Sequence, residues 1–394
     1  MMQLFLNGLA ASAGAGLTYV RNVVPHLSRQ QGVRTTIALS PGLRRELGDP
    51  PNISFLEFET SGAVRRFRQE QTILPELIRR SGAEVLISAG NFALRKSPVP
   101  QILLSGNSLY TSADFYRDLR KRGELGLWLD TRARAVLARR SILWADSTVA
   151  PSRAFAAELQ RWTGRKVVSI HHGFDQAAFF RDNSALPADI EEKIRSDQDA
   201  LRILFVSHYN YYRNFETLLR ALPQLQRRLA KRKIQLFLTC KLSPGQNPGA
   251  YKPDTAAALV RSLGIADQVV ELGTVPYRLL HQVYRACHIY VTSAYAETFA
   301  HPLVEAMASG LPVVASDLAV HREICGASGL YFQRFSPEDL AEQVLQVAQA
   351  EGVARNLSER GLARARDFSW SGHVEQILSL ARTLTGETGI SAAK

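Results

Sequence analysis

The sequence predicts an α/β protein with two domains, each built on a parallel β-sheet. Its 394 residues exceed what one hydrophobic core usually serves. Short apolar runs alternate with helical patterns along most of the chain, and this alternation favours parallel sheets with helices on both faces. A polar, charged stretch at about 180–199 interrupts the alternation once, so we expect the linker there.

Six short apolar runs in the first half have the length and composition of strands. They lie at 4–6, 35–39, 53–58, 85–88, 102–104 and 167–170. Helical patterns separate several of them, at 17–30, 64–81 and 152–162. The chain starts with MMQLFLNGLAASAGAG, which lacks a basic start and a long apolar core. We therefore interpret it as a strand and a loop rather than a signal peptide.

The strand–helix rhythm restarts after the charged stretch. The expected strands lie at 203–207, 235–239, 269–272, 289–292 and 312–315. A helix is expected over 214–232 and a last helix over 371–384. Two Rossmann-like domains follow from this pattern, over 1–180 and 200–368. In such sheets ligands bind beyond the carboxyl ends of the strands, so functional residues are expected in the loops that follow the strands.

Composition limits the class of protein. Apolar residues make up 46% and charged residues 21%, as in soluble globular proteins, and no apolar run reaches the length of a membrane-spanning helix. Cys240, Cys287 and Cys325 lack metal-ligand spacing, which favours reduced thiols in a cytoplasmic protein. No segment has the pattern of a nucleic-acid-binding module, so we expect no nucleic-acid partner despite the net charge of +12.

The positive charge belongs to the first half. Residues 1–180 hold 24 Lys and Arg against 14 Asp and Glu, a net charge of +10, and residues 181–394 hold 24 against 22, a net charge of +2. Basic residues are densest over 117–140, where they alternate with apolar residues. They are Arg117, Arg120, Lys121, Arg122, Arg132, Arg134, Arg139 and Arg140. Such a segment either lies on an anionic membrane surface or forms a solvated helix with a core-facing apolar side, and both interpretations stay open.

The segment 297–317, ETFAHPLVEAMASGLPVVASD, is the most informative stretch of the chain. Pro302 suits the start of a helix, because its missing N–H would be unpaired there in any case. Glu297 then lies in the loop before the helix and Glu305 lies in its first turn. Backbone N–H groups and the positive end of the helix dipole converge at this point. Two carboxylates beside an anion-binding helix start suit a ligand with hydroxyls and phosphates, such as a nucleotide sugar.

This segment resembles the signature of the retaining glycosyltransferases of family 4. That family has two glutamates separated by seven residues, like Glu297 and Glu305, followed by an Ala-Met-Ala-x-Gly-x-Pro-Val-Val run that matches 306–314. Weaker likenesses to the family lie at 145–147, 170–175, 263–265 and 368–370. The resemblance implies the GT-B fold: two Rossmann-like domains facing across a cleft, with the C-terminal helix 371–384 crossing back to an acceptor-binding N-terminal domain.

The resemblance also implies roles for residues around the helix start. Glu305 would accept hydrogen bonds from ribose hydroxyls, and Glu297 would bind sugar hydroxyls and stabilise positive charge at the anomeric carbon. Phe299 and Ala300 would offer backbone N–H groups to the diphosphate or the sugar. The family commonly has Gly at the position of Ala300, and alanine costs little there unless φ is positive. His301 either borders the sugar pocket or lies on the surface.

A departing diphosphate needs its negative charge stabilised. The loop at 206–214 joins a strand to a helix, the usual place for a phosphate, and Arg213 resembles the family's Lys. We expect Arg213 to contact the donor and to act in catalysis. His208 stands roughly where the family often has Arg, and Lys241 follows the next strand. Both are candidates for further phosphate contacts, with a surface role as the alternative.

The first half supplies further candidates. Ala13-Gly14-Ala15-Gly16 resembles the family's glycine-rich loop, where Gly14 and Gly16 would let the backbone approach the phosphate or the acceptor; a tight strand–helix turn is the alternative. Asn107 follows a strand where many family members have a His near the sugar, so it can bind a hydroxyl but cannot take a proton. The adjacent histidines at 171–172 point to opposite faces of an extended segment and have no further ligand nearby, so we expect no metal site.

These residues predict a glycosyltransferase that moves a sugar from a nucleoside-diphosphate sugar to a saccharide or lipid-linked acceptor. The resemblance implies retention of configuration and no cofactor, with front-face attack and double displacement both open. The basic first half favours cell-surface polysaccharide or glycolipid synthesis by a cytoplasmic protein, peripheral at the inner face of the membrane. The alternatives are a nucleotide-sugar epimerase or hydrolase on the same fold, and a non-catalytic protein that binds polyanions.

Overall fold

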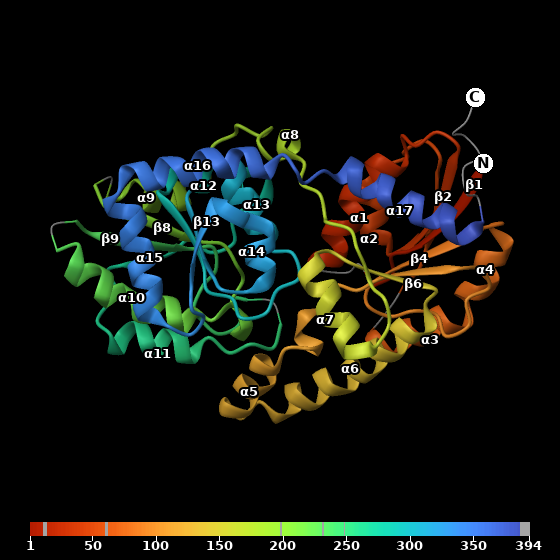
Figure 1. The fold of residues 1–394 in the computed structure, drawn as a ribbon, viewed down its shortest axis with the longest axis horizontal. Coiled ribbons are helices and arrows are strands. Elements are labelled where there is room, and N and C mark those ends of the chain that lie inside the picture. The colour runs from red at the N-terminus through yellow and green to blue at the C-terminus, as the bar shows by residue number, and fades with distance from the viewer. Residues whose placement is uncertain (11–13, 60–61, 198, 231, 248, 387–394) are drawn as a thin grey trace. The chain divides into compact units, whose positions relative to one another are not determined.

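The computed structural model describes residues 1–10, 14–59, 62–197, 199–230, 232–247 and 249–386. These residues form two compact units (Figure 1). Unit 1 comprises Met1–Thr111, Gly123–Gly173 and the chain from Ser369 onward, and unit 2 comprises Ser112–Arg122 and Phe174–Phe368. The sequence analysis assigned 112–122 to the first domain, whereas the structure groups it with unit 2.

Unit 1 is built on a seven-stranded parallel sheet. Its strands are β1 (Met2–Asn7), β2 (Val33–Leu39), β3 (Ile53–Glu57), β4 (Val85–Ala89), β5 (Gln101–Leu104), β6 (Ser147–Ala150) and β7 (Val168–Ser169). Their spatial order is β3-β2-β1-β4-β5-β6-β7. The strand order reverses between β1 and β4, and the carboxyl ends of the strands at such a point are the usual place for a ligand.

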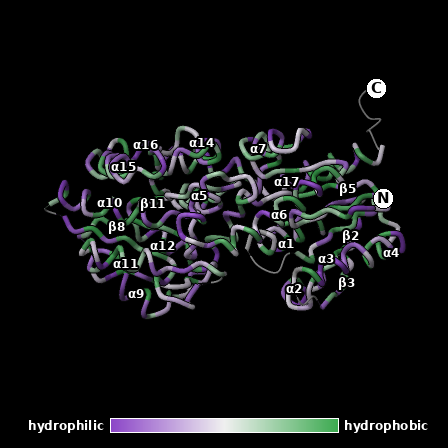
Figure 2. Tube along the Cα trace, turned by 90° about the horizontal axis from the view of Figure 1, so that it is seen from below, coloured by the Kyte–Doolittle hydropathy of each residue, from purple (hydrophilic) through white to green (hydrophobic). Residues whose placement is uncertain are grey.

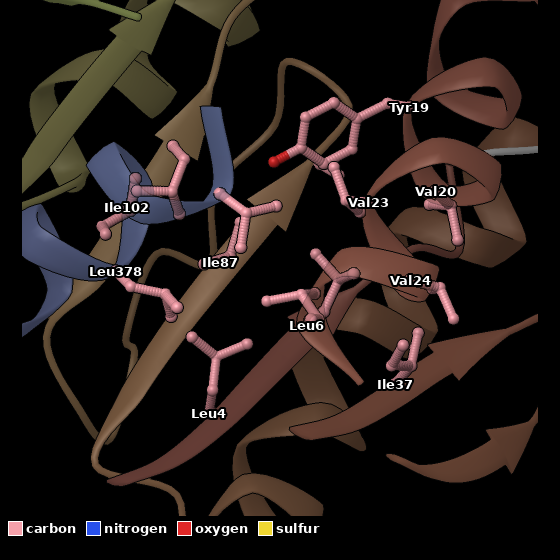
Figure 3. Close-up of a cluster of buried hydrophobic side chains, with 14 of the residues drawn as sticks. Leu4, Leu6, Tyr19, Val20, Val23, Val24, Ile37, Ile87, Ile102 and Leu378 are labelled. Carbon is pink, nitrogen blue, oxygen red and sulfur yellow. The ribbon is translucent and has the colours of Figure 1, made fainter. Parts of the chain in front are cut away.

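Helices cover the two faces of this sheet (Figure 1). They are α1 (Gly14–Leu27), α2 (Pro41–Leu47), α3 (Ala63–Thr72), α4 (Leu74–Arg80), α6 (Leu125–Trp144), α7 (Arg153–Thr163) and α17 (Trp370–Thr385), with a 3-10 turn η1 (Ser108–Tyr110). Successive residues of β1 point to opposite faces, so Leu4 and Leu6 enter one core and Phe5 enters the other. Figure 3 shows the first core, where α1 contributes Val20 and α17 contributes Leu378.

Unit 2 has a six-stranded parallel sheet in the order β10-β9-β8-β11-β12-β13. The strands are β8 (Leu201–Phe205), β9 (Ile234–Leu238), β10 (Val269–Glu271), β11 (Ile289–Thr292), β12 (Val313–Ser316) and β13 (Gly329–Phe332). The short strand β13, at one edge of the sheet, was not predicted from the sequence. The inner strands β8, β9, β11 and β12 are almost wholly buried and apolar, as parallel strands covered on both faces must be.

The helices of unit 2 surround this sheet. They are α5 (Ala113–Lys121), α8 (Gln176–Phe179), α9 (Ala188–Arg195), α10 (Phe215–Arg228), α11 (Asp254–Ser262), α12 (Leu280–Ala286), α13 (His301–Ala308), α14 (Ala319–Cys325), α15 (Pro337–Gln349) and α16 (Glu351–Ala365). Short 3-10 turns are η2 (Tyr211–Arg213), η3 (Tyr277–Leu279) and η4 (Gly326–Ser328). Along the outer helices the trace changes repeatedly between hydrophobic and hydrophilic, because each helix has one face toward the sheet (Figure 2).

Polar contacts attach α5 to unit 2. Arg122, at its carboxyl end, forms ion pairs with Asp118 at 3.0 Å and with Glu216 of α10 at 2.8 Å. The Tyr295 hydroxyl donates a hydrogen bond to Asp118 at 2.7 Å. Arg122 thus turns inward, and Gly123, with a φ of 71°, separates α5 from α6. The basic segment expected over 117–140 is divided between two helices that belong to different units. No described helix has both the length and the apolar character needed to cross a bilayer.

Candidate functional site

The start of α13 bends the chain through a left-handed residue. Ala300 caps this helix with a φ of 65° and a ψ of 67°. Only glycine adopts this region without steric cost, and an L-residue there is strained by about 1–2 kcal/mol. Alanine was expected to cost little here unless φ was positive, and φ is positive. Packing holds the turn, because the buried Phe299 ring lies 4.9 Å from the His301 ring and 5.4 Å from the Phe368 ring.

Arg213 and Glu297 form an ion pair, although 84 residues separate them in the sequence. Their side chains are only 18% and 12% exposed. The Thr298 N–H donates to the other Glu297 carboxylate oxygen at 3.0 Å. Burial raises the pKa of the Glu297 carboxyl, but the Arg213 charge and the Thr298 N–H outweigh it and hold the pKa below its ordinary value. Glu297 is therefore ionised at neutral pH.

The backbone around Arg213 is fixed from the neighbouring strand. The Ser293 hydroxyl, just after β11, donates to the carbonyls of Arg213 and Asn214, each at 2.9 Å. Asn214 is left-handed, with a φ of 54°, a conformation that asparagine tolerates. The Arg213 Nε is buried and has no hydrogen-bond partner among the described residues. A buried donor without a partner costs free energy. An anionic ligand that accepted a hydrogen bond from the Nε–H group would recover that cost.

Glu305 is a buried carboxyl in the second turn of α13, not in the first turn as predicted from the sequence, because the helix begins at His301. It is 4% exposed, and the Tyr284 hydroxyl of α12 donates to its Oε2 at 2.9 Å. Burial raises the pKa of the Glu305 carboxyl to about 7, against hydrogen bonds from Tyr284 and Tyr277 that lower it. The Tyr284 ring also lies 5.8 Å from the ring of Tyr290 of β11. Glu297 and Glu305 both belong to the segment that follows this strand, Glu297 in the loop before α13 and Glu305 in the helix itself.

The other candidates of unit 2 lie in the loops after β8 and β9. The Lys241 ammonium donates to the Glu271 carbonyl at 3.0 Å, and the Leu242 N–H donates to the Glu271 carboxylate at 3.0 Å. Lys241 is thus a half-buried cation held in a fixed place. His208 is exposed, and its carbonyl accepts from the Ser207 hydroxyl at 2.6 Å and the Asn210 amide at 3.2 Å. These two bonds order the backbone of the loop but leave the His208 ring on the surface.

A pocket lies at the carboxyl edge of the unit 1 sheet. It has about 490 Å³ of empty space, part of it open to solvent. It is lined by Gly16, Tyr19, Ala89, Gly90, Asn91, Leu104, Ser105, Gly106, Val149, Pro151, Ile170, His172 and His373. None of these is Lys, Arg, Asp or Glu. Gly90 has a φ of 146°, and a Cβ there would lie 2.3 Å from the Ala10 Cβ, so only glycine fits this wall.

Histidine and tyrosine side chains order the floor of this pocket. His373 Nδ1 lies 2.8 Å from the His171 carbonyl, which can only accept, so Nδ1 carries the proton. Nε2 of a neutral imidazole is then an acceptor, and the Tyr19 hydroxyl donates to it at 3.2 Å. The His172 ring stacks on Trp370 with centroids 5.5 Å apart and an interplanar angle of 29°. The histidines at 171–172 thus contribute a carbonyl and a stacked ring to the floor of the pocket. Among the described residues, no group of three His, Cys, Asp or Glu side chains is arranged so that it could hold a metal ion.

The structure separates the sequence candidates of the first half. Gly16 lines the pocket and Gly14 begins α1, whereas Ala13 lies outside the described residues. Asn107 caps the turn η1, because its Oδ1 accepts from the Leu109 N–H at 3.0 Å. The neighbours Ser105 and Asn91 line the pocket instead, and Asn91 Oδ1 accepts from the Gly106 N–H at 2.7 Å. Sequence patterns did not single out Asn91.

Comparison with known proteins identifies the family of the second unit. The family model described as "Glycosyl transferases group 1" matches residues 188–364. Unit 2 carries a glycosyltransferase domain of group 1. Its matched range contains Arg213, Glu297 and Glu305, so the ion pair and the buried carboxyl described above belong to the glycosyltransferase domain.

Curated relatives of this glycosyltransferase domain match part of their length. The D-inositol 3-phosphate glycosyltransferase of Actinosynnema mirum is 31% identical over 222 residues, which are 54% of this chain and 51% of that protein. The protein of the same name from Nocardia farcinica is 29% identical over 178 residues, which are 45% of this chain and 39% of that protein. The chain spans about half the length of the curated relatives it matches.

Solved structures extend the likeness to the fold of both units. Sucrose-phosphate synthase from Thermosynechococcus elongatus has a TM-score of 0.77 and 19% identity, over 98% of this chain and 100% of that one. HepE from Anabaena, solved with UDP-glucose, has a TM-score of 0.70 and 17% identity, over 98% and 100%. The predicted GT-B fold, with two Rossmann-like parallel-sheet domains, is confirmed.

The glycosyltransferase domain also holds a buried histidine that the sequence analysis did not single out. His321 of α14 is fully buried, and its Nδ1 lies 3.1 Å from the Ser316 carbonyl, so Nδ1 donates and Nε2 carries the lone pair. Nε2 has no partner among the described residues. Burial lowers the pKa of His321 to about 4, against the Glu297 charge, which raises it. His321 is therefore a neutral group buried in the glycosyltransferase domain.

Proposed function

We propose that the protein is a glycosyltransferase that moves a sugar from a nucleoside-diphosphate sugar to a saccharide or lipid-linked acceptor, with retention of configuration. The observation that carries this proposal is the buried ion pair between Arg213 and Glu297, which lies in the loop that leads into α13, the helix that carries Glu305. Arg213 follows β8 and Glu297 follows β11, which are neighbours in the sheet, so both lie where parallel α/β sheets bind ligands. A cation and two carboxylates at one such edge suit a diphosphate joined to hydroxylated rings.

In this proposal Glu305 binds the ribose of the donor. A carboxylate can accept hydrogen bonds from two adjacent ribose hydroxyls, and such charge-assisted bonds are strong. The pKa of about 7 means that the free site holds a proton for about half of the time at neutral pH. Hydroxyl donors favour the ionised form, so donor binding would release a proton from Glu305.

Arg213 acts on the leaving diphosphate in this proposal. Negative charge develops there as the glycosidic bond breaks, and a fixed cation in a water-poor site stabilises it. The pair with Glu297 holds the guanidinium ready before the donor arrives, so little reorganisation is needed. Lys241 and the backbone N–H groups of Phe299 and Ala300 are further candidates for contacts to the diphosphate. His208, in the same loop as Arg213, is another candidate for such a contact.

Glu297 acts on the transferred sugar. Its depressed pKa keeps it ionised at neutral pH, so it can accept hydrogen bonds from sugar hydroxyls. The same negative charge stabilises the positive charge that develops at the anomeric carbon. Ionisation of Glu297 does not depend on the bound donor, because Arg213 and the Thr298 N–H already enforce it.

The acceptor part of the proposal rests on the pocket of unit 1. Its lining combines apolar walls with polar groups from Asn91, Ser105 and His172, and the lining residues include no Lys, Arg, Asp or Glu. Apolar walls with a few polar groups fit a neutral saccharide ring better than a phosphate. Asn107 remains a candidate through its amide NH₂, because its oxygen already caps η1. We therefore propose that unit 1 (with 1–180 as its main part and the helix at 371–384) holds an uncharged sugar of the acceptor.

Product analysis tests the proposed reaction. Since HepE was solved with UDP-glucose, UDP-glucose is the first donor to supply, followed by other nucleoside-diphosphate sugars. Incubation with mono- and oligosaccharide acceptors should give a new glycoside with the anomeric configuration of the donor. Free sugar as the sole product, with or without acceptor, would identify a nucleotide-sugar hydrolase, and an altered nucleotide sugar would identify an epimerase. Absence of any nucleotide-sugar turnover across the panel would refute an enzyme of this class.

A further inference from the structure

Helix α6 has apolar residues on two opposite faces. One face packs into unit 1 through Thr131, Ala135, Ala138, Ser141 and Ile142. The other face is exposed: Leu125 and Leu129 are each 62% exposed, Val136 is 56% exposed and Leu143 is 43% exposed. At 3.6 residues per turn these four side chains fall within about 40° of one another around the helix axis.

This exposed stripe is concentrated on one helix. Among the described residues, ten large apolar side chains are exposed, and four of them belong to α6. Exposed apolar residues scattered singly need no explanation, but a line of four along one helix does. Folding of unit 1 does not require them, because the opposite face of α6 already packs into the core. The stripe is therefore available to something outside the chain.

Positive charges flank the stripe. Arg132, Arg139 and Arg140 are exposed, and helix geometry places all three within about 60° of it. Asp130 is the acidic residue of α6, and it is held by Arg134 at 2.8 Å on another side of the helix. The stripe thus combines apolar side chains with cations and has no carboxylate beside it on the helix.

A cationic pocket adjoins this face. Leu137, Arg140 and Trp144 of α6 line it, together with Phe67, Arg95 and Lys96, around about 1200 Å³ of empty space that includes open solvent. No carboxylate lines the pocket, and none of the described residues pairs with its three cations. Gln71 fixes the segment that carries Arg95, because its amide oxygen accepts from the Arg95 N–H at 2.8 Å. Arg140 belongs both to this pocket and to the arginines beside the stripe.

We propose that this face of α6 docks on the surface of an anionic phospholipid membrane. Leu125, Leu129, Val136 and Leu143 enter the boundary between headgroups and acyl chains, the flanking arginines lie at the phosphates, and the pocket of Arg95, Lys96 and Arg140 holds a headgroup phosphate. An apolar line beside cations is the pattern of helices that lie in the plane of a membrane surface. Anionic lipid attracts the cations, and the apolar stripe anchors the helix after contact.

Charge complementarity favours lipid over the other occupants. A polyanion such as nucleic acid would use the arginines but would leave the four apolar side chains in water. A second copy of the chain would cover the apolar stripe but would bring the same arginines together. Anionic lipid satisfies both parts of the face at once. This inference goes beyond the proposed reaction, since no residue of α6 belongs to the glycosyltransferase domain.

Sedimentation of the full chain with vesicles tests the proposal. The probe is vesicles of phosphatidylcholine alone or mixed with phosphatidylglycerol, at low and high salt. The protein should bind the mixed vesicles at low salt, bind them less at high salt, and bind phosphatidylcholine weakly. The double variant Leu129→Ser/Val136→Ser should lower binding to mixed vesicles by about tenfold or more, because each buried CH₂ contributes to anchoring.

Two further variants separate the parts of the face. The triple variant Arg95→Gln/Lys96→Gln/Arg140→Gln should remove most of the preference for anionic over neutral vesicles. Leu362→Ser, an exposed leucine of α16, is the matched control and should leave binding unchanged. All variants should melt like the wild type, because the altered side chains lie on the surface.

Three results would overturn the proposal. The first is that the wild type does not bind mixed vesicles at low salt, and the second is that Leu129→Ser/Val136→Ser binds them as well as the wild type does. The third is that the protein forms a dimer without lipid and that the same double variant abolishes this dimer. Such a dimer would assign the stripe to a second copy of the chain. None of them would bear on nucleotide-sugar turnover, which is measured on a soluble acceptor.

Discussion

The two units have the same α/β architecture but opposite electrostatics at the carboxyl edges of their sheets. In unit 2 the edge holds buried charges: Arg213 pairs with Glu297, and Glu305 lies against Tyr284. In unit 1 the edge holds a pocket lined by glycines, small residues and neutral rings. In the proposed function, unit 2 binds the charged diphosphate of the donor at this edge, and unit 1 holds an uncharged sugar of the acceptor. That proposal assigns to one fold two sites whose ligands differ in charge.

Breaking the ion pair is the most severe test of this contrast. Arg213→Ala leaves Glu297 buried without its partner, and loss of one member of a buried pair costs about 3–5 kcal/mol. The expected result is a lower free energy of unfolding in urea. The double variant Arg213→Met/Glu297→Gln should recover much of that loss, because no unpaired charge remains. Equal losses in the single and double variants would mean that packing, and not charge, governs this edge.

Glu305→Gln should change the pH dependence of stability. The folded pKa of about 7 lies above the ordinary value of 4.5. The folded state therefore holds more protons between these values, and stability falls as pH rises from about 4.5 through 7. Each unit of pKa shift corresponds to about 1.4 kcal/mol, so the wild type should lose roughly 3–4 kcal/mol across this window relative to the variant.

Unfolding of both proteins at several pH values measures this difference. The variant should be the more stable protein at pH 8, and the gap should shrink toward pH 5. A gap that does not change with pH would show that Glu305 has an ordinary pKa. The exposed Glu342, which pairs with Arg228 on the surface, provides the control substitution Glu342→Gln, for which no such gap is expected.

Tyr19→Phe tests the neutral site with a smaller effect. The variant removes the hydroxyl that donates to His373 Nε2 and leaves a buried acceptor unpaired, at a cost of about 1–2 kcal/mol in unfolding free energy. The melting shift caused by a nucleoside diphosphate should stay unchanged, since the proposed function assigns the nucleotide to unit 2. Loss of this shift in the variant would contradict that assignment.

Ala300→Gly should have the smallest effect, and it should be stabilising. Glycine adopts a φ of 65° without steric cost, so relief of strain should outweigh the entropy that glycine loses on folding and raise stability by about 0.5–1 kcal/mol. Thermal melting measures the gain. A lower melting temperature would show that the Ala300 methyl group contributes packing that exceeds the strain of its backbone.

Sequence and structure agree best where a motif is local. Glu297 and Glu305 could be located because both lie on one strand–loop–helix segment, and Arg213 because it lies in the loop after an obvious apolar strand. Their convergence follows from topology, since β8 and β11 are neighbours in a parallel sheet. The pocket of unit 1 could not be located in this way, because its walls come from loops after several strands and from α17.

Other differences between the predicted and the observed structure have specific physical causes. Residues 112–122 belong to unit 2 because Arg122 pairs with Glu216, 94 residues away, and no local pattern reveals such a contact. The strand β13 is short and half-buried, so its apolar pattern is weak. Helix α6 has apolar residues on both faces, so periodicity alone could not tell a core-facing helix from an exposed one, whereas the measured exposure of Leu125 and Leu129 does.

The rate of sugar transfer by Glu297→Gln tests the assignment of the reaction to the Arg213–Glu297 edge most directly. The variant keeps the shape of the side chain and can still accept from the Thr298 N–H, but it removes the charge beside the anomeric carbon. Transfer from the active nucleotide sugar should fall by about 10²-fold or more in kcat, while the melting shift caused by the nucleoside diphosphate alone persists. A variant that folds, binds the nucleotide and transfers sugar at the wild-type rate would contradict this assignment.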